Sequence, residues 1–442
     1  MSQPSTATAV APAPQPPATQ PVTTQPLTTQ PLVPLGAVPP EVATPTSDTP
    51  ARLRRLRAVV VGSGVALAVL GTLAMALLTL TLRQGASDVE QLLRVQTIET
   101  DLLVADANAT NTFLVGGLES PERRAAYDAA LADVADLVAR SAQAQPADAA
   151  ALSALNAQVL DYASLVEAAR ANNRQGLPVG AQYLRQASNG LRADALPVAD
   201  ALVQANAKRA SASLTTGWGW AVPLLGLAVL VVLVVVQLRV ARLFRRRLNP
   251  GLLTASLVVL ALVIASTALM ARLFLATDLA RGEGDLATSA GDARVQANLA
   301  KSSESLTLIA RGSGQAYEQS WQSSAAVVHE RLTTDRILAP FVHDFESYAQ
   351  VHRKVRALDD GGSWDAAVEL AVGSGTGSSN AAFAPFDQKM ADIARSSGAS
   401  AVQDLRNQGA GLVVGCLLTL LAGLASAWAG SRGISTRLRE YR

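Results

Sequence analysis

Cysteine is nearly absent from this sequence of 442 residues, which contains only Cys416. A single cysteine excludes a disulfide within the chain, so any domain outside the cytoplasm must be stabilised by packing alone. Charged residues are also scarce, at 16 % against roughly 25 % in a soluble globular domain. Hydrophobic residues make up 49 %, and we therefore expect part of the chain to lie in a membrane. The net charge of +2 gives no reason to expect a nucleic-acid partner.

Motifs for catalysis and for metal or cofactor binding are missing too. The histidines lack a zinc-binding spacing such as HExxH, and the glycines of residues 312–314 and 373–377 are not followed by the Lys-Ser/Thr of a phosphate-binding loop. Cys416 lies in an apolar run, and the serines of residues 302–305 lack a nucleophile-elbow pattern. We predict a protein that is not an enzyme, with no catalytic, cofactor-binding or metal-binding residues and no cofactor. The sequence does not identify any ligand-binding residues.

Residues 1–50 form a tail dominated by Pro, Thr, Gln, Ala and Val. Closely spaced prolines oppose both helix and sheet, so the tail is predicted to be disordered. It has no apolar core near Met1 and is therefore not a signal peptide. Its threonines and prolines could dock a partner or be phosphorylated.

Four apolar runs follow the tail, at residues 58–82, 218–238, 252–273 and 410–430. Each is long enough, at about 1.5 Å per residue, to cross the roughly 30 Å hydrocarbon core of a bilayer. Arg272, at the end of the third run, is the only charged residue in any of them. A core helix of a soluble protein would normally show a polar face. We predict an all-α membrane protein with four transmembrane helices.

Arginine clusters flank these runs and predict their orientation, because short segments rich in positive charge stay in the cytoplasm. The clusters precede the first run, occupy residues 239–250, and follow the fourth run in residues 431–442. All three fall on one side of a four-pass topology. Both termini and the Arg-rich loop are therefore predicted to be cytoplasmic, and residues 83–217 and 274–409 to be extracytoplasmic.

Residues 83–217 have the pattern of four amphipathic helices. Breaks fall at residues 116–117, 145–146 and 175–178, and Ser120-Pro121-Glu122 has the residue types of a helix start. Apolar residues recur every three or four positions in the last three helices: Tyr127, Leu131, Val134 and Val138; Leu152, Leu155, Val159, Tyr162, Val166 and Ala169; Ala187, Leu191, Ala195, Val198, Leu202 and Ala205. We predict an antiparallel four-helix bundle.

The first and last helices of this bundle are expected to continue into the membrane. No helix breaker separates Ser87 from the first apolar run, and the fourth helix runs towards Trp218 except at Pro197. Because proline removes a backbone hydrogen bond, Pro197 is interpreted as a break between two helices in preference to a hinge.

Residues 274–409 predict a second, less regular helical domain. Its breaks are the glycines of residues 312–314 and 361–362 and a Gly/Ser loop at residues 373–379. A short helix is expected around Trp364 to Val372. One helical face is shared by Phe341, Phe345, Tyr348, His352 and Val355, where we expect His352 to be a packed side chain. Both halves have the order helix, domain, helix, which suggests an old duplication.

Small residues, not charges, mark the membrane helices. Coupled transporters usually place ionisable groups at mid-membrane, and none is found there. Gly62, Ala66, Gly411 and Gly415 have a small-xxx-small spacing. That spacing suits close helix packing or a homodimer, and it equally suits an Ala-rich chain in which these residues have no such role.

The layout resembles two kinds of signalling protein. Residues 83–217 resemble the four-helix sensor domains of bacterial chemoreceptors and sensor kinases, and residues 431–442 resemble the start of the linker after their last membrane helix. More of the chain is similar to the GlnX-type four-pass membrane signalling proteins of actinobacteria. That similarity rests on length, topology and three stretches: NATNTFLVGG at 108–117, ANNRQGLP at 171–178 and ESLTLIARGSG at 304–314.

The GlnX-type resemblance implies a partner on each side of the membrane. One is an extracytoplasmic solute-binding lipoprotein for glutamate, aspartate or glutamine, and the other a cytoplasmic serine/threonine protein kinase. Because the predicted cytoplasmic parts are too short for a catalytic domain, we predict a non-enzymatic signal transducer in the cell membrane. Two alternatives stay open: a direct small-molecule receptor with its ligand in an outer bundle, and a transporter subunit or envelope scaffold.

Overall fold

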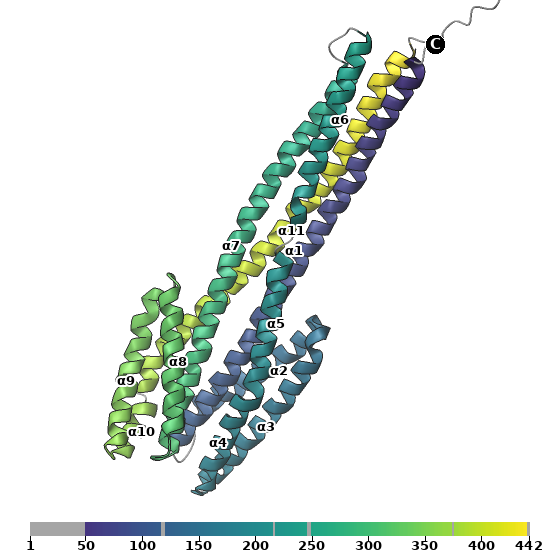
Figure 1. Ribbon diagram of the computed structural model, residues 1–442. Helices are drawn as coiled ribbons and strands as arrows, with labels where there is room; N and C mark the ends of the chain where they lie inside the picture. The colour runs from purple at the N-terminus through teal and green to yellow at the C-terminus, as the bar shows by residue number, and fades with distance from the viewer. Residues whose placement is uncertain (1–48, 116–119, 215–216, 245–248, 374, 440–442) are drawn as a thin grey trace, which may run out of the picture. The chain divides into compact units, whose positions relative to one another are not determined.

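The computed structural model describes residues 49–115, 120–214, 217–244, 249–373 and 375–439, so the predicted tail lies almost wholly outside the described residues. In the described part every regular element is helical, and the protein is an all-α membrane protein, as predicted. The first half contains α1 (Thr49–Val115), α2 (Pro121–Ala144), α3 (Ala149–Arg174), α4 (Val179–Gly190), α5 (Leu196–Leu214) and α6 (Ala221–Phe244). The second contains α7 (Pro250–Ile309), α8 (Gln315–Thr334), α9 (Val342–Asp360), α10 (Trp364–Val372) and α11 (Ser379–Arg439) (Figure 1).

Among the described residues, four helices are long and apolar enough to cross a membrane: α1, α6, α7 and α11. They contain three of the four predicted runs entirely and the second run from Ala221 onward, which makes the protein a multi-pass membrane protein. Helices α1, α7 and α11 are unbroken for 67, 60 and 61 residues. At about 1.5 Å per residue each is roughly 90–100 Å long, about three times the hydrocarbon thickness. Each therefore crosses the membrane and continues into an extramembrane bundle (Figure 1).

Helices α1 and α11 approach closely in the membrane where small residues face each other. A Cβ atom added to Gly64 would lie 2.8 Å from the backbone nitrogen of Ala427, and one added to Gly423 would lie 2.5 Å from that of Ala68. Side-chain carbons do not approach backbone this closely, so both positions require glycine. Two small-xxx-small pairs thus pack helices of the same chain.

The small residues singled out in the sequence lie elsewhere. Gly62 is exposed, and an added Cβ there would have no neighbour within 4 Å. A Cβ on Gly411 would lie 3.9 Å from Leu269, and one on Gly415 would contact Leu269 and Met75 at 3.3 and 3.5 Å. The small-xxx-small spacing therefore lies on a packed side of α11, at Gly411 and Gly415, but on an exposed side of α1, at Gly62. A homodimer through Gly62 stays a prediction.

The extramembrane part of α1 forms a four-helix bundle with α2, α3 and the α4–α5 segment, which we call the first bundle. Most residues of the predicted stripes are buried in its core, and Leu131 and Val198 are packed against it. Ser120 precedes α2, and its hydroxyl accepts a hydrogen bond from the backbone N–H of Arg123 at 3.5 Å, which confirms the predicted helix start. The predicted break at residues 116–117 lies outside the described residues.

Helices α4 and α5 are joined by a π-helical turn, Leu191–Ala195, and the helix continues through Pro197. The interpretation of Pro197 as a break between two helices was therefore wrong. A proline ring clashes with the carbonyl four residues earlier, here that of Ala193. The wider π turn lies at this carbonyl and gives the ring room.

Two predicted boundaries differ from the helix ends in the structure. Helix α5 ends at Leu214, and a 3₁₀ turn at Gly217–Trp220 separates it from α6, so the fourth bundle helix does not run unbroken into the membrane. Residues 239–244 of the predicted Arg-rich loop are helical, because α6 extends to Phe244, and α7 begins at Pro250. Within the predicted C-terminal tail, α11 continues as far as Arg439. Arginine is a good helix former, so its clusters mark the edge of the membrane and not the end of a helix.

The extramembrane part of α7 forms the second bundle with α8, α9, α10 and α11. Phe345, Tyr348, His352 and Val355 are buried along one face of α9, as predicted. The predicted turns are also present, with positive φ values at Gly312 and Gly362.

The two bundles share an apolar core. Leu306 and Leu308 of α7 and Ala371 of α10 belong to the same buried cluster as Ile98 and Tyr162 of the first bundle. The far end of α7 is surrounded so completely that every residue from 300 to 310 is buried. A change in the packing of one bundle therefore acts directly on the other.

Candidate functional site

Asp106 of α1 lies at the centre of a buried polar cluster between the bundles, which we call the Asp106 cluster. Its side chain is fully buried and accepts hydrogen bonds from Ser188 of α4 at 2.5 Å and from Tyr162 of α3 at 3.4 Å. From the second bundle, the hydroxyl of Ser302 on α7 also donates to it. Arg192, in the π turn, donates to Ser302 at 2.7 Å and lies 3.6 Å from the Asp106 carboxylate. Because an unpaired buried carboxylate is costly, these helices must keep their relative positions.

Glu304 of α7 lies at the centre of a second cluster, which we call the Glu304 cluster. Lys301 Nζ and Ser379 Oγ donate to Glu304 Oε1 at 2.6 and 2.7 Å. His352 Nδ1 lies 2.9 Å from Glu304 Oε2, and His352 Nε2 lies 3.2 Å from Oε2 of Glu318. The cluster joins α7, α8, α9 and α11 through charged hydrogen bonds, which are stronger than neutral ones.

His352 is held between two carboxylates and is stacked on Trp321, with ring centroids 3.7 Å apart. Burial lowers the pKa of His352, but the hydrogen bonds that its ring donates to the carboxylates of Glu304 and Glu318 outweigh this and raise the pKa above 6.5. Burial also acts to raise the pKa of Glu304, yet Lys301 and His352 hold it well below 4.5. The expectation that His352 is a packed side chain is confirmed, but its two acidic partners were missed.

The two clusters have a similar plan. Each buried acid lies on the first helix of its bundle and contacts a ring on the third helix, Tyr162 of α3 or His352 of α9. Each also accepts a hydroxyl hydrogen bond from a serine of the last helical segment, Ser188 or Ser379. This shared plan supports the duplication that the order of helices suggests.

A third contact joins the bundles at the end of α1. Asn111 of α1 and Asn380 of α11 exchange side-chain hydrogen bonds at 2.9 and 3.1 Å. Arg123 of α2 donates to Asn111 at 2.5 Å and to the carbonyl of Val372 at 2.7 Å. Asn111 lies in one of the stretches that carry the GlnX-type resemblance, and here it connects two transmembrane helices.

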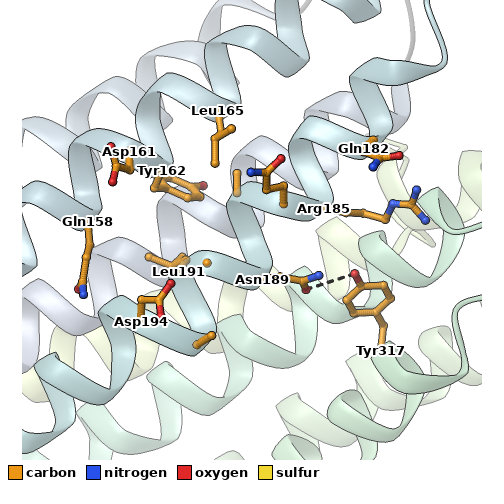
Figure 2. Close-up of a pocket in the computed structure, with 14 residues that line it drawn as sticks. Gln158, Asp161, Tyr162, Leu165, Gln182, Arg185, Asn189, Leu191, Asp194 and Tyr317 are labelled. Carbon is orange, nitrogen blue, oxygen red and sulfur yellow. Dashed lines mark hydrogen bonds between the residues drawn. The ribbon is translucent and has the colours of Figure 1, made fainter.

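A polar groove of about 800 Å³ runs along α3, α4 and the π turn (Figure 2). Gln182 and Asn189 of α4 and Asp194 of the π turn line it. At one end Tyr317 of α8 donates to Asn189 at 3.3 Å, so the groove reaches the second bundle (Figure 2). Tyr162 lines the groove and contacts Asp106 on its inner side. A partner in the groove would therefore touch the Asp106 cluster through one side chain.

The structure also shows where the other candidate residues lie. His329 and His343 are exposed and Cys416 lies in the membrane part of α11. Among the described residues, no group of three or more His, Cys, Asp or Glu is arranged to hold a metal ion.

Sequence reasoning missed both buried acids, although a signal was present. Asp106 stands four residues after Leu102, which stands four after Ile98, and both leucine and isoleucine are fully buried. Glu304 stands four residues after the buried Ala300. A charged residue in register with an apolar stripe is a candidate for a buried, paired position.

Comparison with known proteins adds one finding. A family model described as an actinobacterial sensor domain matches residues 81–215. This range covers the first bundle and contains Asp106, Asn111 and most of the groove. No curated protein and no solved structure matches the chain. Over its first bundle the chain is thus similar to actinobacterial sensor domains, which indicates a sensing or signalling role.

Proposed function

We propose that the protein is a non-enzymatic transmembrane signal transducer. It relays amino-acid availability, sensed through an extracytoplasmic solute-binding lipoprotein, to a cytoplasmic partner such as a serine/threonine protein kinase. The observation that carries the proposal is that α1, α7 and α11 run unbroken from the buried clusters through the membrane. They reach the side where the three arginine clusters lie, and we call these ends of the helices the Arg-rich ends. The similarity to sensor domains over residues 81–215 supports it.

Each of these three helices contributes to the buried clusters. Asp106 lies on α1, Ser302 and Glu304 on α7, and Ser379 on α11. Helices change position mainly between discrete packings, because close-packed interiors do not deform continuously. A partner that prefers one packing of the bundles would therefore move the helices together.

The same three helices are also joined at their Arg-rich ends. Asn249 caps α7, accepting from the backbone N–H of Gly251 at 3.1 Å, and donates to the carbonyl of Gly433 on α11 at 2.9 Å. Arg57 of α1 donates to Ser431 of α11 at 3.0 Å. A helix shift would alter these contacts on the face where the kinase would bind. We place this face in the cytoplasm because of its arginines.

Photo-cross-linking in the native membrane tests both partners. A cross-linkable residue at Gln182, exposed in the groove, is expected to capture the lipoprotein, and one at Thr436, exposed near the end of α11, the kinase. Leu160, exposed on α3 outside the groove, and Leu257, exposed in the membrane part of α7, serve as matched controls.

Capture of the lipoprotein at Gln182 but not at Leu160 would support docking in the groove. Capture of extracytoplasmic proteins at Thr436 would overturn the orientation. If Gln182 captures only what Leu160 captures, and Thr436 captures no kinase at any amino-acid concentration, the proposed relay is wrong.

A further inference from the structure

Seven exposed arginine side chains lie at the end of the molecule where α1 begins and where α6 and α11 end (Figure 1). We call this set the arginine collar: Arg52, Arg54, Arg55 and Arg57 of α1, Arg239 and Arg242 of α6, and Arg432 of α11. Arg57 donates a hydrogen bond to Ser431 Oγ at 3.0 Å. The guanidinium of Arg432 lies 5.3 Å from the ring centroid of Trp428. Both contacts are with neutral side chains, so neither balances a charge.

Acidic side chains are too few to balance the collar. Residues 48–57, 239–250 and 431–442 together contain 13 arginines and only two acids, Asp48 and Glu440. The next acid along α1 is Asp88, which lies beyond the far end of the membrane span. The collar is therefore a surface of excess positive charge, and its counter-ions must come mainly from outside the chain.

The collar lies at the level of the lipid headgroups. Val59 of α1 is 49 % exposed and Leu238 of α6 is 51 % exposed, so the hydrocarbon layer reaches these two residues. Arg57 is two positions from Val59, which is about 3 Å along the helix. Arg239 directly follows Leu238. Since the headgroup layer is roughly 5–7 Å thick on each side of the bilayer, lipid phosphates lie within reach of these guanidinium groups.

Side-chain direction brings the last arginines of α6 and α11 closer to the lipid. Side chains in a helix point towards its N-terminus, and at this end of both helices that direction leads back into the membrane. Arg432 lies over the ring of Trp428, which is one turn earlier on α11 and 65 % exposed. Tryptophan is enriched at membrane interfaces, so Arg432 shares that layer.

We propose that the arginine collar binds anionic phospholipids and that these lipids set the packing of the Arg-rich ends. Guanidinium groups bind phosphate oxygens through paired, charge-assisted hydrogen bonds. A lipid with a net negative charge also balances the excess charge of the collar, whereas a zwitterionic lipid brings a cation of its own. A folded protein would approach from the water beyond the headgroups, so the position of the collar favours lipid.

The bound lipid would act on the positions of the helices. The collar arginines of α1 and α11 carry like charges and repel each other, although Arg57 and Ser431 join the same two helices. Anionic phosphates between them reduce the repulsion and allow close packing. The lipid composition of the membrane would then bias the helix ends that the proposed relay moves. The inference stands without the kinase and the lipoprotein, because it rests only on charge and position.

Native mass spectrometry of the full chain in detergent tests the binding. The probes are phosphatidylglycerol and phosphatidylcholine with the same acyl chains, which differ in net charge. We expect phosphatidylglycerol to bind about tenfold more tightly, and R54Q/R55Q to lose most of this difference. Both arginines are exposed, and the hydrogen bond of Arg57 is left in place. R140Q/R353Q removes the same charge from side chains that are 68 % and 59 % exposed in the bundles, and it should keep the wild-type preference.

Distances from pulsed electron resonance test the effect on packing. Spin labels at A51C and T436C, both exposed positions, report the separation of α1 and α11 in a C416S background. In nanodiscs of phosphatidylcholine we expect a longer or broader distance distribution than in nanodiscs that contain phosphatidylglycerol. R54Q/R55Q should reduce this difference between the two lipids, because it removes part of the repulsion.

Three results would overturn the proposal: equal binding of the two lipids, an unchanged preference in R54Q/R55Q, or the same distance distribution in both lipids. If the two lipids bind equally but R54Q/R55Q abolishes capture of the kinase at Thr436, the collar is a docking surface for an acidic protein and the lipid proposal is wrong.

Discussion

Nδ1 of His352 lies 2.9 Å from Oε2 of Glu304, in a core that leaves 1 % of the histidine side chain exposed. The other ring nitrogen faces Glu318. When both nitrogens face carboxylate oxygens, both are best satisfied as donors, which requires the imidazolium cation. The packing of the second bundle therefore depends on a buried positive charge, and the two carboxylates raise the pKa of the histidine that carries it.

The charge on His352 predicts a pH-dependent stability. Since its pKa is raised above 6.5 in the folded protein, the stabilisation is fully present below pH 6.5 and is lost as pH rises through the folded value. H352Q should lose roughly 3 kcal/mol at pH 6, because Glu304 keeps its burial without this partner. Thermal unfolding in nanodiscs from pH 6 to 9 measures both effects. H343Q, an exposed control, should behave like wild type, and an H352Q profile parallel to wild type would refute the assignment.

Glu99 of α1 predicts a second pH effect, in the first bundle. Burial, together with the nearby Asp200 and Asp292, raises its pKa from 4.5 to about 8. The folded state binds this proton more tightly, so its stabilisation is present below pH 4.5 and lost as pH rises to about 8. E99Q should be more stable than wild type by a few kcal/mol at pH 8.5 and nearly unchanged at pH 4.5. Chemical unfolding at the two pH values checks this, and equal stability at pH 8.5 would contradict it.

The hydrogen bond between Arg192 and Ser302 predicts an energetic coupling between the bundles. In a double-mutant cycle, R192A and S302A should show an interaction energy of about 1 kcal/mol. Ser303 is the matched control, since it donates within its own bundle to the carbonyl of Leu299 at 2.7 Å. R192A and S303A should be additive, and additivity of R192A with S302A would show that the contact does not couple the bundles.

Close packing of α1 against α11 predicts that substitutions at two glycines of the membrane region change the stability of the protein to very different extents. G423L should destabilise the protein strongly, because an added Cβ would lie 2.5 Å from the backbone nitrogen of Ala68. G62L should have little effect, since nothing lies within 4 Å of its added Cβ. Thermal unfolding in detergent compares the variants. Equal damage from G62L would instead place Gly62 in an interface, such as that of a homodimer.

The helices and their faces could be predicted from the sequence because they follow from local patterns. The apolar run at residues 58–82 and the stripe from Leu152 to Ala169 each act through neighbours within a few turns. Pro197 was misinterpreted for a related reason: the π turn that accommodates its ring is a small backbone change without a residue signature of its own. Arginine clusters likewise show where the membrane ends but not where the helix ends.

The candidate sites could not be predicted, because each joins residues that are far apart in the sequence. Asp106 and Ser302 meet across 196 positions, and Asn111 and Asn380 across 269. The register of Asp106 with an apolar stripe could mark it as buried, but no local pattern shows which distant residue is its partner. Only the assembled bundles show that they are buried and paired.

If the protein relays a signal through its long helices, the Asp106 cluster controls the relative positions of the Arg-rich ends. Spin labels at R54C and T436C, both exposed positions, report the distance between α1 and α11 there by pulsed electron resonance in a C416S background. D106N weakens the cluster by removing its charge, and D133N on the exposed face of α2 is the control. We expect a shifted or broadened distance distribution in D106N and a wild-type distribution in D133N. A folded D106N protein with the wild-type distribution would contradict it.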